Sequence, residues 1–187
     1  MRIVGGQWAG VSLVSPGPRV RPTGEEMRAA WISGLEPDLV KARVLDLFAG
    51  TGALGLEALS RGASSVDFVE NGASALHALK ANLAKLRVRN RTRLFKKDAF
   101  LFLAGLEALA PDPLAPYALA YDLALADPPY TSPAADRLAA LWLERPFSRI
   151  LCVEHATERT LPRPGKRKHF GESAVTTYRI RKRDPGA

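Results

Sequence analysis

From residue 43 onward, short apolar runs alternate with segments in which apolar residues recur every three or four positions. The apolar runs predict buried strands at residues 44–48, 64–70, 92–97, 122–127 and 149–155. The periodic segments predict helices between these strands, one ending near Leu59 and others at 73–86, 98–109 and 133–143. Strands alternating with helices indicate an α/β fold with a doubly wound, mainly parallel sheet. Such sheets bind ligands at the carboxyl ends of their strands.

The first forty residues have a different pattern. A short extended start at 2–4 is followed by a turn-rich segment and a helical pattern at 25–35. Thr23 and Glu26 have the spacing of a capping box for that helix, and Pro37 is expected to end it. We therefore expect residues 1–40 to form a β/helix extension.

The C-terminal end adds two more strands to the prediction. Residues 166–183 carry two strand-like runs on either side of Gly171, which predicts an antiparallel hairpin. With the five parallel strands, this hairpin makes a seven-stranded sheet in a main domain at residues 41–187.

Composition is that of an ordinary globular protein, with 47% hydrophobic and 25% charged residues in 187. Cys152 has no second cysteine to pair with and lies in an apolar run, so we expect a buried side chain and a reducing cytoplasm. No apolar run has the length of a membrane span. His77, His155 and His169 lack ligand spacing, so no metal site is expected.

The net charge of +8 is concentrated in two segments. Residues 85–97 carry seven basic residues and no acidic one, and residues 159–183 carry nine basic residues and one acidic one. The rest of the chain is therefore acidic. Basic segments on an otherwise acidic protein favour a polyanionic partner such as a nucleic acid. A thermophile's preference for surface arginine is the alternative explanation.

A glycine-rich segment separates the first predicted strand from its helix. The run LDLFAGTGALG at 45–55 has the spacing G-x-G-x-x-G, with Gly50, Gly52 and Gly55. Glycine lets the backbone turn tightly and approach a ligand. Glu70 ends the next strand, where a carboxylate binds the ribose hydroxyls of an adenosine. Dinucleotide-binding enzymes share this pattern, so alone it does not identify the cofactor.

Two further acids favour S-adenosylmethionine over a nicotinamide cofactor. Asp46 lies in the first strand, close to the glycines, where it would repel a pyrophosphate but attract the positively charged methionine end. Asp98 follows the third strand, where it is placed to accept a hydrogen bond from the adenine amino group. Asp98 is also a good helix N-cap, and one residue can serve both purposes.

The fourth strand ends in Asp127-Pro128-Pro129-Tyr130, or DPPY, the most specific motif in the chain. The prolines remove two backbone donors and leave carbonyls that only accept hydrogen bonds. Asp127 and the Pro128 carbonyl can each accept one hydrogen from an exocyclic amine, which aims its lone pair at a methyl donor. Tyr130 can stack on the base. The remaining alternative is a Pro-Pro loop that merely stops a strand.

Through these motifs, the sequence resembles the RsmD-type 16S ribosomal RNA (guanine-N2)-methyltransferases of bacteria. The resemblance covers nearly the whole chain. It rests on MRIVGGQWAG at the start, RVRPTGEEMR (19–28), the glycine block through residue 63, FVE ending in Glu70, DPPY, and TTYRIRKR (176–183). The chain departs from the usual family pattern at Ala29, at Trp31-Ile32 and at Asn71-Gly72.

The resemblance implies a Rossmann-like class I methyltransferase fold that uses S-adenosylmethionine. It implies methylation of a guanine N2 in 16S rRNA, within the small ribosomal subunit or a late assembly intermediate, with the N-terminal extension covering the site and contacting RNA. The candidate catalytic residues are Asp127, Pro128, Pro129 and Tyr130. The candidate cofactor contacts are Asp46, Phe48, Gly50, Gly52, Glu70 and Asp98. The candidate RNA contacts are Arg19, Arg21, Thr23, Arg87, Arg89, Lys166, Arg167 and Lys168.

Three other functions are compatible with parts of this pattern. A DNA adenine-N6 methyltransferase uses the same DPPY chemistry but generally carries an added target-recognition region. A non-catalytic RNA-binding or assembly module would not need an amine-orienting pair. A Rossmann oxidoreductase would need an acid/base set for hydride transfer, which we do not find. We expect a monomer.

Overall fold

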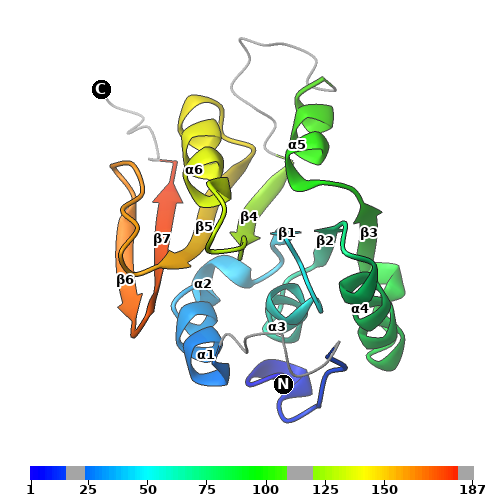
Figure 1. Ribbon diagram of the computed structural model, residues 1–187. Coiled ribbons are helices and arrows are strands. Elements are labelled where there is room, and N and C mark those ends of the chain that lie inside the picture. Colours follow the sequence, from blue (N-terminus) through cyan, green and yellow to red (C-terminus); the bar gives the residue numbers. More distant parts are fainter. Residues whose placement is uncertain (16–23, 109–119, 181–187) are drawn as a thin grey trace, which may run out of the picture.

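The computed structural model describes residues 1–15, 24–108 and 120–180 (Figure 1). Within this part of the chain, seven strands form one sheet in the order β3-β2-β1-β4-β5-β7-β6. The strands are β1 (Arg43–Leu47), β2 (Ser65–Glu70), β3 (Thr92–Lys96), β4 (Tyr121–Ala126), β5 (Ser148–Ala156), β6 (Lys166–Phe170) and β7 (Ser173–Arg179). The first five are mutually parallel, and β7 is antiparallel to both β5 and β6. The predicted doubly wound sheet with an antiparallel C-terminal hairpin is confirmed.

Helices cover both faces of the sheet. One face packs against α1 (Glu25–Ser33), α2 (Glu36–Leu39), α3 (Ala53–Ser60) and α4 (Ala73–Lys85). The other face packs against α5 (Ala99–Ala108) and α6 (Ala134–Glu144). Two single turns of 3₁₀ helix, η1 (Gly6–Trp8) and η2 (Arg89–Arg91), complete the described elements.

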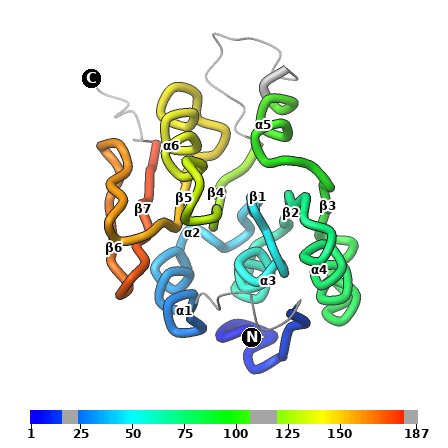
Figure 2. The backbone as a smooth tube through the Cα atoms, in the orientation of Figure 1, coloured from blue at the N-terminus to red at the C-terminus, as the bar shows by residue number. Residues whose placement is uncertain are grey.

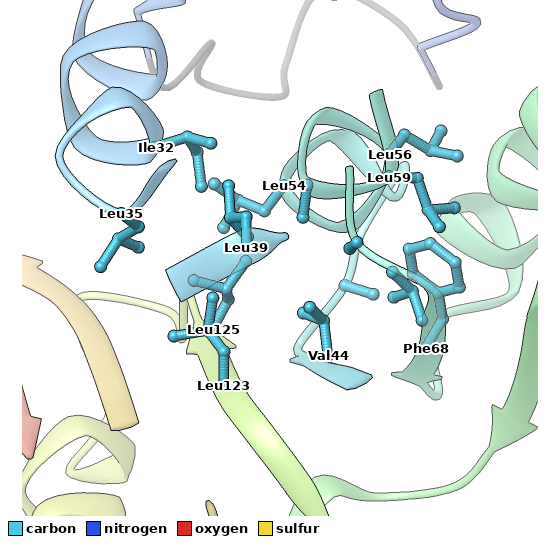
Figure 3. Close-up of a cluster of buried hydrophobic side chains, with 14 of the residues drawn as sticks. Ile32, Leu35, Leu39, Val44, Leu54, Leu56, Leu59, Phe68, Leu123 and Leu125 are labelled. Atoms are coloured by element: carbon cyan, nitrogen blue, oxygen red, sulfur yellow. The ribbon is translucent and has the colours of Figure 1, made fainter. Parts of the chain in front are cut away.

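Alternation along the strands divides the core between the two faces. In β1, Val44 packs under α1 to α4 whereas the next residue, Leu45, packs against α5 and α6. In β4, Leu123 and Ala124 divide in the same way, because successive side chains in a strand point to opposite faces. Figure 3 shows the first cluster, in which strand and helix side chains meet. At the carboxyl ends of the strands, side chains an even number of residues from Val44 or Leu123 in the same strand therefore point to the same face of the sheet.

The N-terminal segment packs on the outer side of α3 and α4. Arg2 forms an isolated bridge with Ser12, the Trp8 amide donates to Ser60 Oγ at 3.0 Å, and the Val14 amide donates to Asn82 Oδ1 at 2.7 Å. Figure 2 shows this segment beside α3. The predicted division into an extension and a main domain stays a prediction.

Two expectations about the first helix need revision. Gly24 is the N-cap of α1 and makes no side-chain capping bond, while Thr23 lies outside the described residues. Pro37 does not end this helix. α1 ends at Ser33, and Pro37 lies in the first turn of α2, where its missing N–H leaves no helical hydrogen bond unmade.

A buried ion cluster fastens α1 to α3 and to the N-terminal segment. Glu57 is 0% exposed and accepts hydrogen bonds from the Val4 amide and Arg61 Nε, both at 2.9 Å. Arg28 is 1% exposed, and its Nε lies 3.9 Å from Glu57 Oε2 while Nη2 donates to the Arg2 carbonyl. Burial lowers the pKa of Arg28, and the Glu57 carboxylate opposes that shift.

Two smaller findings concern membrane-spanning helices and the cysteine. Among the described residues, no helix has the length and hydropathy needed to cross a membrane. Cys152 is confirmed as a buried side chain, and burial raises the pKa of its thiol to about 11.

Candidate active site

Four adjacent strands each place one carboxylate on the same face of the sheet, at its carboxyl edge. Asp46 lies near the end of β1, where Phe68 of β2 and Leu125 of β4 are its register partners. Glu70 and Asp127 each lie two residues beyond those partners. Glu154 of β5 is level with Asp127, because the residues two positions before them are paired. Shared parity directs all four side chains to one face. We call Glu70, Asp46, Asp127 and Glu154 the acidic row.

The members of the acidic row also influence one another's pKa values. Burial, then the Asp127 and Glu70 carboxylates, raise the pKa of Asp46 well above its ordinary value. Burial, then the Asp127 carboxylate, raise the pKa of Glu154 to about 7. Within the described parts of the chain, neither Asp46 nor Glu154 forms an ion pair. Buried carboxyls that lie close to one another create a negative electrostatic potential, which favours a cationic ligand.

Asp46 is oriented by the helix that follows it. Its Oδ2 accepts a hydrogen bond from the Gly55 amide at 2.9 Å, in the first turn of α3. Its Oδ1 is buried and has no partner among the described residues. A buried carboxylate oxygen without a partner is costly, so a ligand with a positive charge or a donor group fits at this atom.

The three glycines of the loop have different roles. A Cβ on Gly52 would lie 2.4 Å from Leu79 Cδ1, and one on Gly55 would lie 2.4 Å from Phe68 Cε1. Gly55 therefore lets α3 pack closely on β2, and Gly52 lets the loop pack closely on α4. At Gly50, with φ +56°, the nearest atom to a Cβ is the Phe48 carbonyl oxygen at 4.0 Å, so Gly50 faces open space. Gly50 is therefore the position where a ligand can approach the backbone.

Glu70 ties the glycine loop to the start of α4. Its Oε2 accepts from the Gly50 amide at 2.7 Å, and its Oε1 accepts from the Gly72 amide at 2.7 Å and the Asn71 amide at 2.9 Å. The carboxylate is thus fixed beside the open position of the loop. Oε2 accepts only one of these hydrogen bonds. Its second lone pair leaves Oε2 able to accept from a ribose hydroxyl.

Phe48 and Asp98 border the same region. Phe48 has φ +56°, a left-handed conformation that is strained for an aromatic residue, and its ring meets Phe100 edge-on with centroids 6.1 Å apart. Asp98 Oδ1 accepts from the Phe100 amide at 2.8 Å and the Leu101 amide at 3.1 Å. Asp98 therefore caps α5, as the sequence allowed, and its other oxygen has no partner among the described residues.

The two proline carbonyls of the DPPY turn differ in their hydrogen bonds. The Pro129 carbonyl accepts from the Ser132 amide at 3.0 Å and from Ser132 Oγ at 2.8 Å. The Pro128 carbonyl receives no hydrogen bond from any residue that the structure describes. Asp127 and Pro128 thus place a carboxylate and an available carbonyl side by side, which is the pair that an exocyclic amine requires.

Tyr130 is fixed at its hydroxyl end. It donates to Glu154 Oε1 at 2.7 Å and also contacts Ser173 Oγ on β7. Arg159 donates to the Tyr130 carbonyl at 3.2 Å and pairs with Asp136 of α6. Sequence reasoning missed Glu154, Ser173 and Arg159. The available signal was Glu154, an acid that directly follows the apolar run at 150–153 of a predicted strand.

The predicted RNA contacts lie near opposite edges of the sheet. Lys166, Arg167 and Lys168 are on the edge strand β6, and Arg167 donates to the Thr157 carbonyl. Arg87 and Arg89 are exposed just before β3, the other edge strand, at its amino end (Figure 1). Arg19, Arg21 and Thr23 lie outside the described residues. In the described ranges, no group of three or more metal-ligating side chains is assembled.

The strand order, the glycine loop and the carboxyl-edge site define a Rossmann-like fold of the class I methyltransferase type. The family model described as conserved hypothetical protein 95 matches residues 1–179, and the chain belongs to that family. The expected kinship with the RsmD-type family is confirmed by the relatives that the chain matches.

Two curated relatives and one solved structure illustrate the kinship. Ribosomal RNA small subunit methyltransferase D of Escherichia coli is 44% identical over 105 residues, which is 56% of this chain and 52% of that protein. The protein of the same name from Haemophilus influenzae is 29% identical over 96% of this chain and 92% of its own. A solved structure described as putative methyltransferase yhhF from Escherichia coli is 32% identical, with a TM-score of 0.76 over 96% of this chain and 97% of that one. The match to the first relative thus spans about half of its length.

Proposed function

We propose that this protein transfers a methyl group from S-adenosylmethionine to the exocyclic N2 of a specific guanine in 16S rRNA of the small ribosomal subunit. The observation that carries the proposal is the acidic row, whose member Asp127 is followed directly by the available Pro128 carbonyl. It places an amine-orienting pair next to a site suited to a cationic cofactor. The names of the relatives support a small-subunit rRNA substrate.

The acidic row and the glycine loop fit S-adenosylmethionine. The unpartnered Asp46 Oδ1 suits the positively charged methionine end, Gly50 gives the backbone room for a ligand, and Glu70 is placed for the ribose hydroxyls. Asp98 keeps one oxygen for the adenine amino group. When bound, the cofactor supplies a methyl group that its sulfonium sulfur has already activated. The protein's own task is to hold and align the amine.

This assignment predicts a selective thermal shift. S-adenosylmethionine at about 100 times its Kd should add roughly 2.7 kcal/mol to the free energy of unfolding, because it binds only the folded state. NAD at the same concentration should leave the melting temperature unchanged, because its pyrophosphate would meet the acidic row. Differential scanning fluorimetry measures both. Stabilisation by NAD and not by S-adenosylmethionine would contradict the assignment.

Asp127 and Pro128 orient the amine. Each accepts one N–H, which leaves the nitrogen lone pair directed at the methyl carbon, and the alignment itself supplies most of the acceleration. Adenine N6 is an exocyclic amine too, so the same turn would serve a DNA adenine methyltransferase. The relatives named for small-subunit rRNA favour guanine in 16S rRNA over that alternative.

The positions of the basic residues favour a large RNA substrate. β3 and β6 are six strand spacings apart, or about 29 Å. A substrate that contacts both groups while its base lies in the DPPY turn has to extend over most of the sheet, as an assembled ribosomal particle does. In paired RNA one hydrogen of guanine N2 is bonded to cytosine, whereas Asp127 and Pro128 together need both, so the target must be an unpaired or flipped base. The 16S rRNA in a nearly assembled small subunit meets both requirements.

Methylation should therefore depend on assembly. We expect 30S particles from a strain lacking the enzyme to be methylated at least tenfold faster than naked 16S rRNA or a hairpin with the target loop.

The affinity for RNA should fall steeply with salt. Each phosphate that the protein neutralises should contribute about 0.7–0.9 to the slope of log affinity against log salt concentration. The double variant Lys166→Gln, Lys168→Gln should flatten that slope, and Lys80→Gln, outside both basic segments, should not. Equal rates on hairpin and 30S would contradict the proposal.

A further inference from the structure

Glu154 is a buried acid beside the site, and orienting the amine through Asp127 and Pro128 does not require it. Its side chain is 2% exposed, on the face of β5 that carries the acidic row. Oε1 accepts the Tyr130 hydroxyl at 2.7 Å, whereas Oε2 is buried and receives no hydrogen bond from a donor group of the described residues. An acid placed here needs a compensating interaction, because burying an unpaired carboxylate is costly.

The acid beside Glu154 is Asp127, which lies level with it just beyond the neighbouring strand β4. The Asp127 carboxylate raises the pKa of Glu154, so the two carboxyls interact through their charges. A hydrogen bond between two carboxyls exists only when one of them carries a proton, because an ionised carboxylate has nothing to donate. The pair is thus built to hold a single proton, as two close carboxyls cannot both ionise at low cost.

We propose that Glu154 is a positioning residue that shares one proton with Asp127 and links that carboxylate to Tyr130. This inference rests on the proposed function, because Asp127 is the acceptor that orients the amine. With the proton on Glu154, Oε2 donates to Asp127 and fixes its rotamer while leaving it negatively charged. Oε1 holds Tyr130 at the same time. One buried carboxyl therefore aligns two of the four DPPY residues.

The surroundings of Glu154 support placing the proton there. The groups that face it are Asp127 and Tyr130 on the turn after β4 and Ser173 on β7, and Asp46 on β1 acts through Asp127. None of these is cationic. The pKa of Glu154 is raised to about 7, from an ordinary value of 4.5, by burial and by Asp127. The proton is thus retained up to neutral pH, and the contribution of Glu154 to the free energy of unfolding falls as pH rises from about 5 through 7.

The shared proton is testable without any methyl transfer. Carboxyl-¹³C NMR of the free protein should show one glutamate titrating near pH 7, and Glu154→Gln should remove that resonance. Tyr130→Phe should move the titration to higher pH, because it removes a hydrogen bond to the ionised form. Glu158→Gln, an exposed acid just beyond β5, serves as the control and should leave it unchanged. Ordinary titration of every glutamate near pH 4.5 would overturn the shared proton.

The positioning role is tested by kinetics on 30S particles. Glu154→Leu should lower kcat by about 10–100-fold with the Kd of S-adenosylmethionine changed less than threefold. Glu154→Gln should recover most of that rate, since its amide donates to Asp127 and its carbonyl accepts from Tyr130. A Glu154→Leu variant with wild-type kcat, or a Gln variant as slow as the Leu variant, would overturn the role. Failure of the wild-type enzyme to methylate any guanine N2 would instead reject the proposed function, and the NMR result would still stand.

Discussion

Replacing Asp127 with alanine should lower kcat for rRNA methylation by about 10²–10³-fold while the Kd of S-adenosylmethionine stays within a few fold of wild type. The carboxylate is one of two acceptors that orient the amine, and removing a preorganised hydrogen-bonding group at a reacting centre typically has an effect of this size. The bound cofactor is held mainly by Asp46, Glu70 and the glycine loop, which the substitution leaves in place. Single-turnover kinetics with isothermal titration calorimetry separate the two effects.

Asp122→Asn provides a matched control for that experiment. Asp122 lies at the other end of β4, where its carboxylate accepts the Arg43 amide at 2.8 Å, far from the carboxyl edge. We expect its kcat to stay within about twofold of wild type. If Asp127→Ala instead loses cofactor affinity and turnover to the same degree, Asp127 is a structural residue of the cofactor site and not an amine acceptor.

Replacing Glu57 with alanine should destabilise the protein by about 3–5 kcal/mol. Removing one partner of a buried pair leaves the other as an uncompensated charge, here Arg28 at 1% exposure. The Val4 amide and Arg61 lose their acceptor as well. For a domain of this length, the loss corresponds to a fall in Tm of roughly 10 °C. Chemical denaturation checks the free energy of unfolding directly.

Glu36→Gln tests whether burial causes that effect. Glu36 pairs with the same Arg61, but its side chain is 54% exposed, so removing its charge should cost less than about 1 kcal/mol. Similar losses from Glu36→Gln and Glu57→Ala would show that the buried position of Glu57 contributes nothing special. In that case the Arg28–Glu57 contact would not be what fastens α1 to α3.

Most of the fold follows from local patterns in the sequence. The alternation of apolar runs and helical periods predicts the five parallel strands to within about two residues. Four of them, β1, β2, β4 and β5, are buried and therefore apolar. The predictions that were wrong concern the two ends of α1, where polar and turn residues decide the boundary. Pro37 suits the first turn of a helix as well as a position after its end, so its presence alone does not distinguish the two. Only the packing of α2 against the sheet decides between them.

The site is only partly predictable for a different reason. Asp46, Gly50, Glu70 and Asp127 belong to motifs with fixed spacing along the chain. Glu154 belongs to no such motif and joins the site because strand register places β5 beside β4. The same limit applies to the basic segments, which look equivalent in the sequence although one includes the edge strand β3 and the other the opposite edge strand β6. Distances across a sheet are set by strand order, which the sequence pattern does not contain.

The most direct test of the central claim is to map the methyl group. Purified protein, S-adenosylmethionine with an isotopically labelled methyl group, and 30S particles from a strain lacking the enzyme are incubated together, and the 16S rRNA is digested and analysed by mass spectrometry. The proposed function predicts a single labelled nucleotide, N2-methylguanosine. This nucleotide should be absent when the Asp127→Ala variant replaces the wild-type protein. Label on adenine N6, on several unrelated nucleotides, or on none would contradict it.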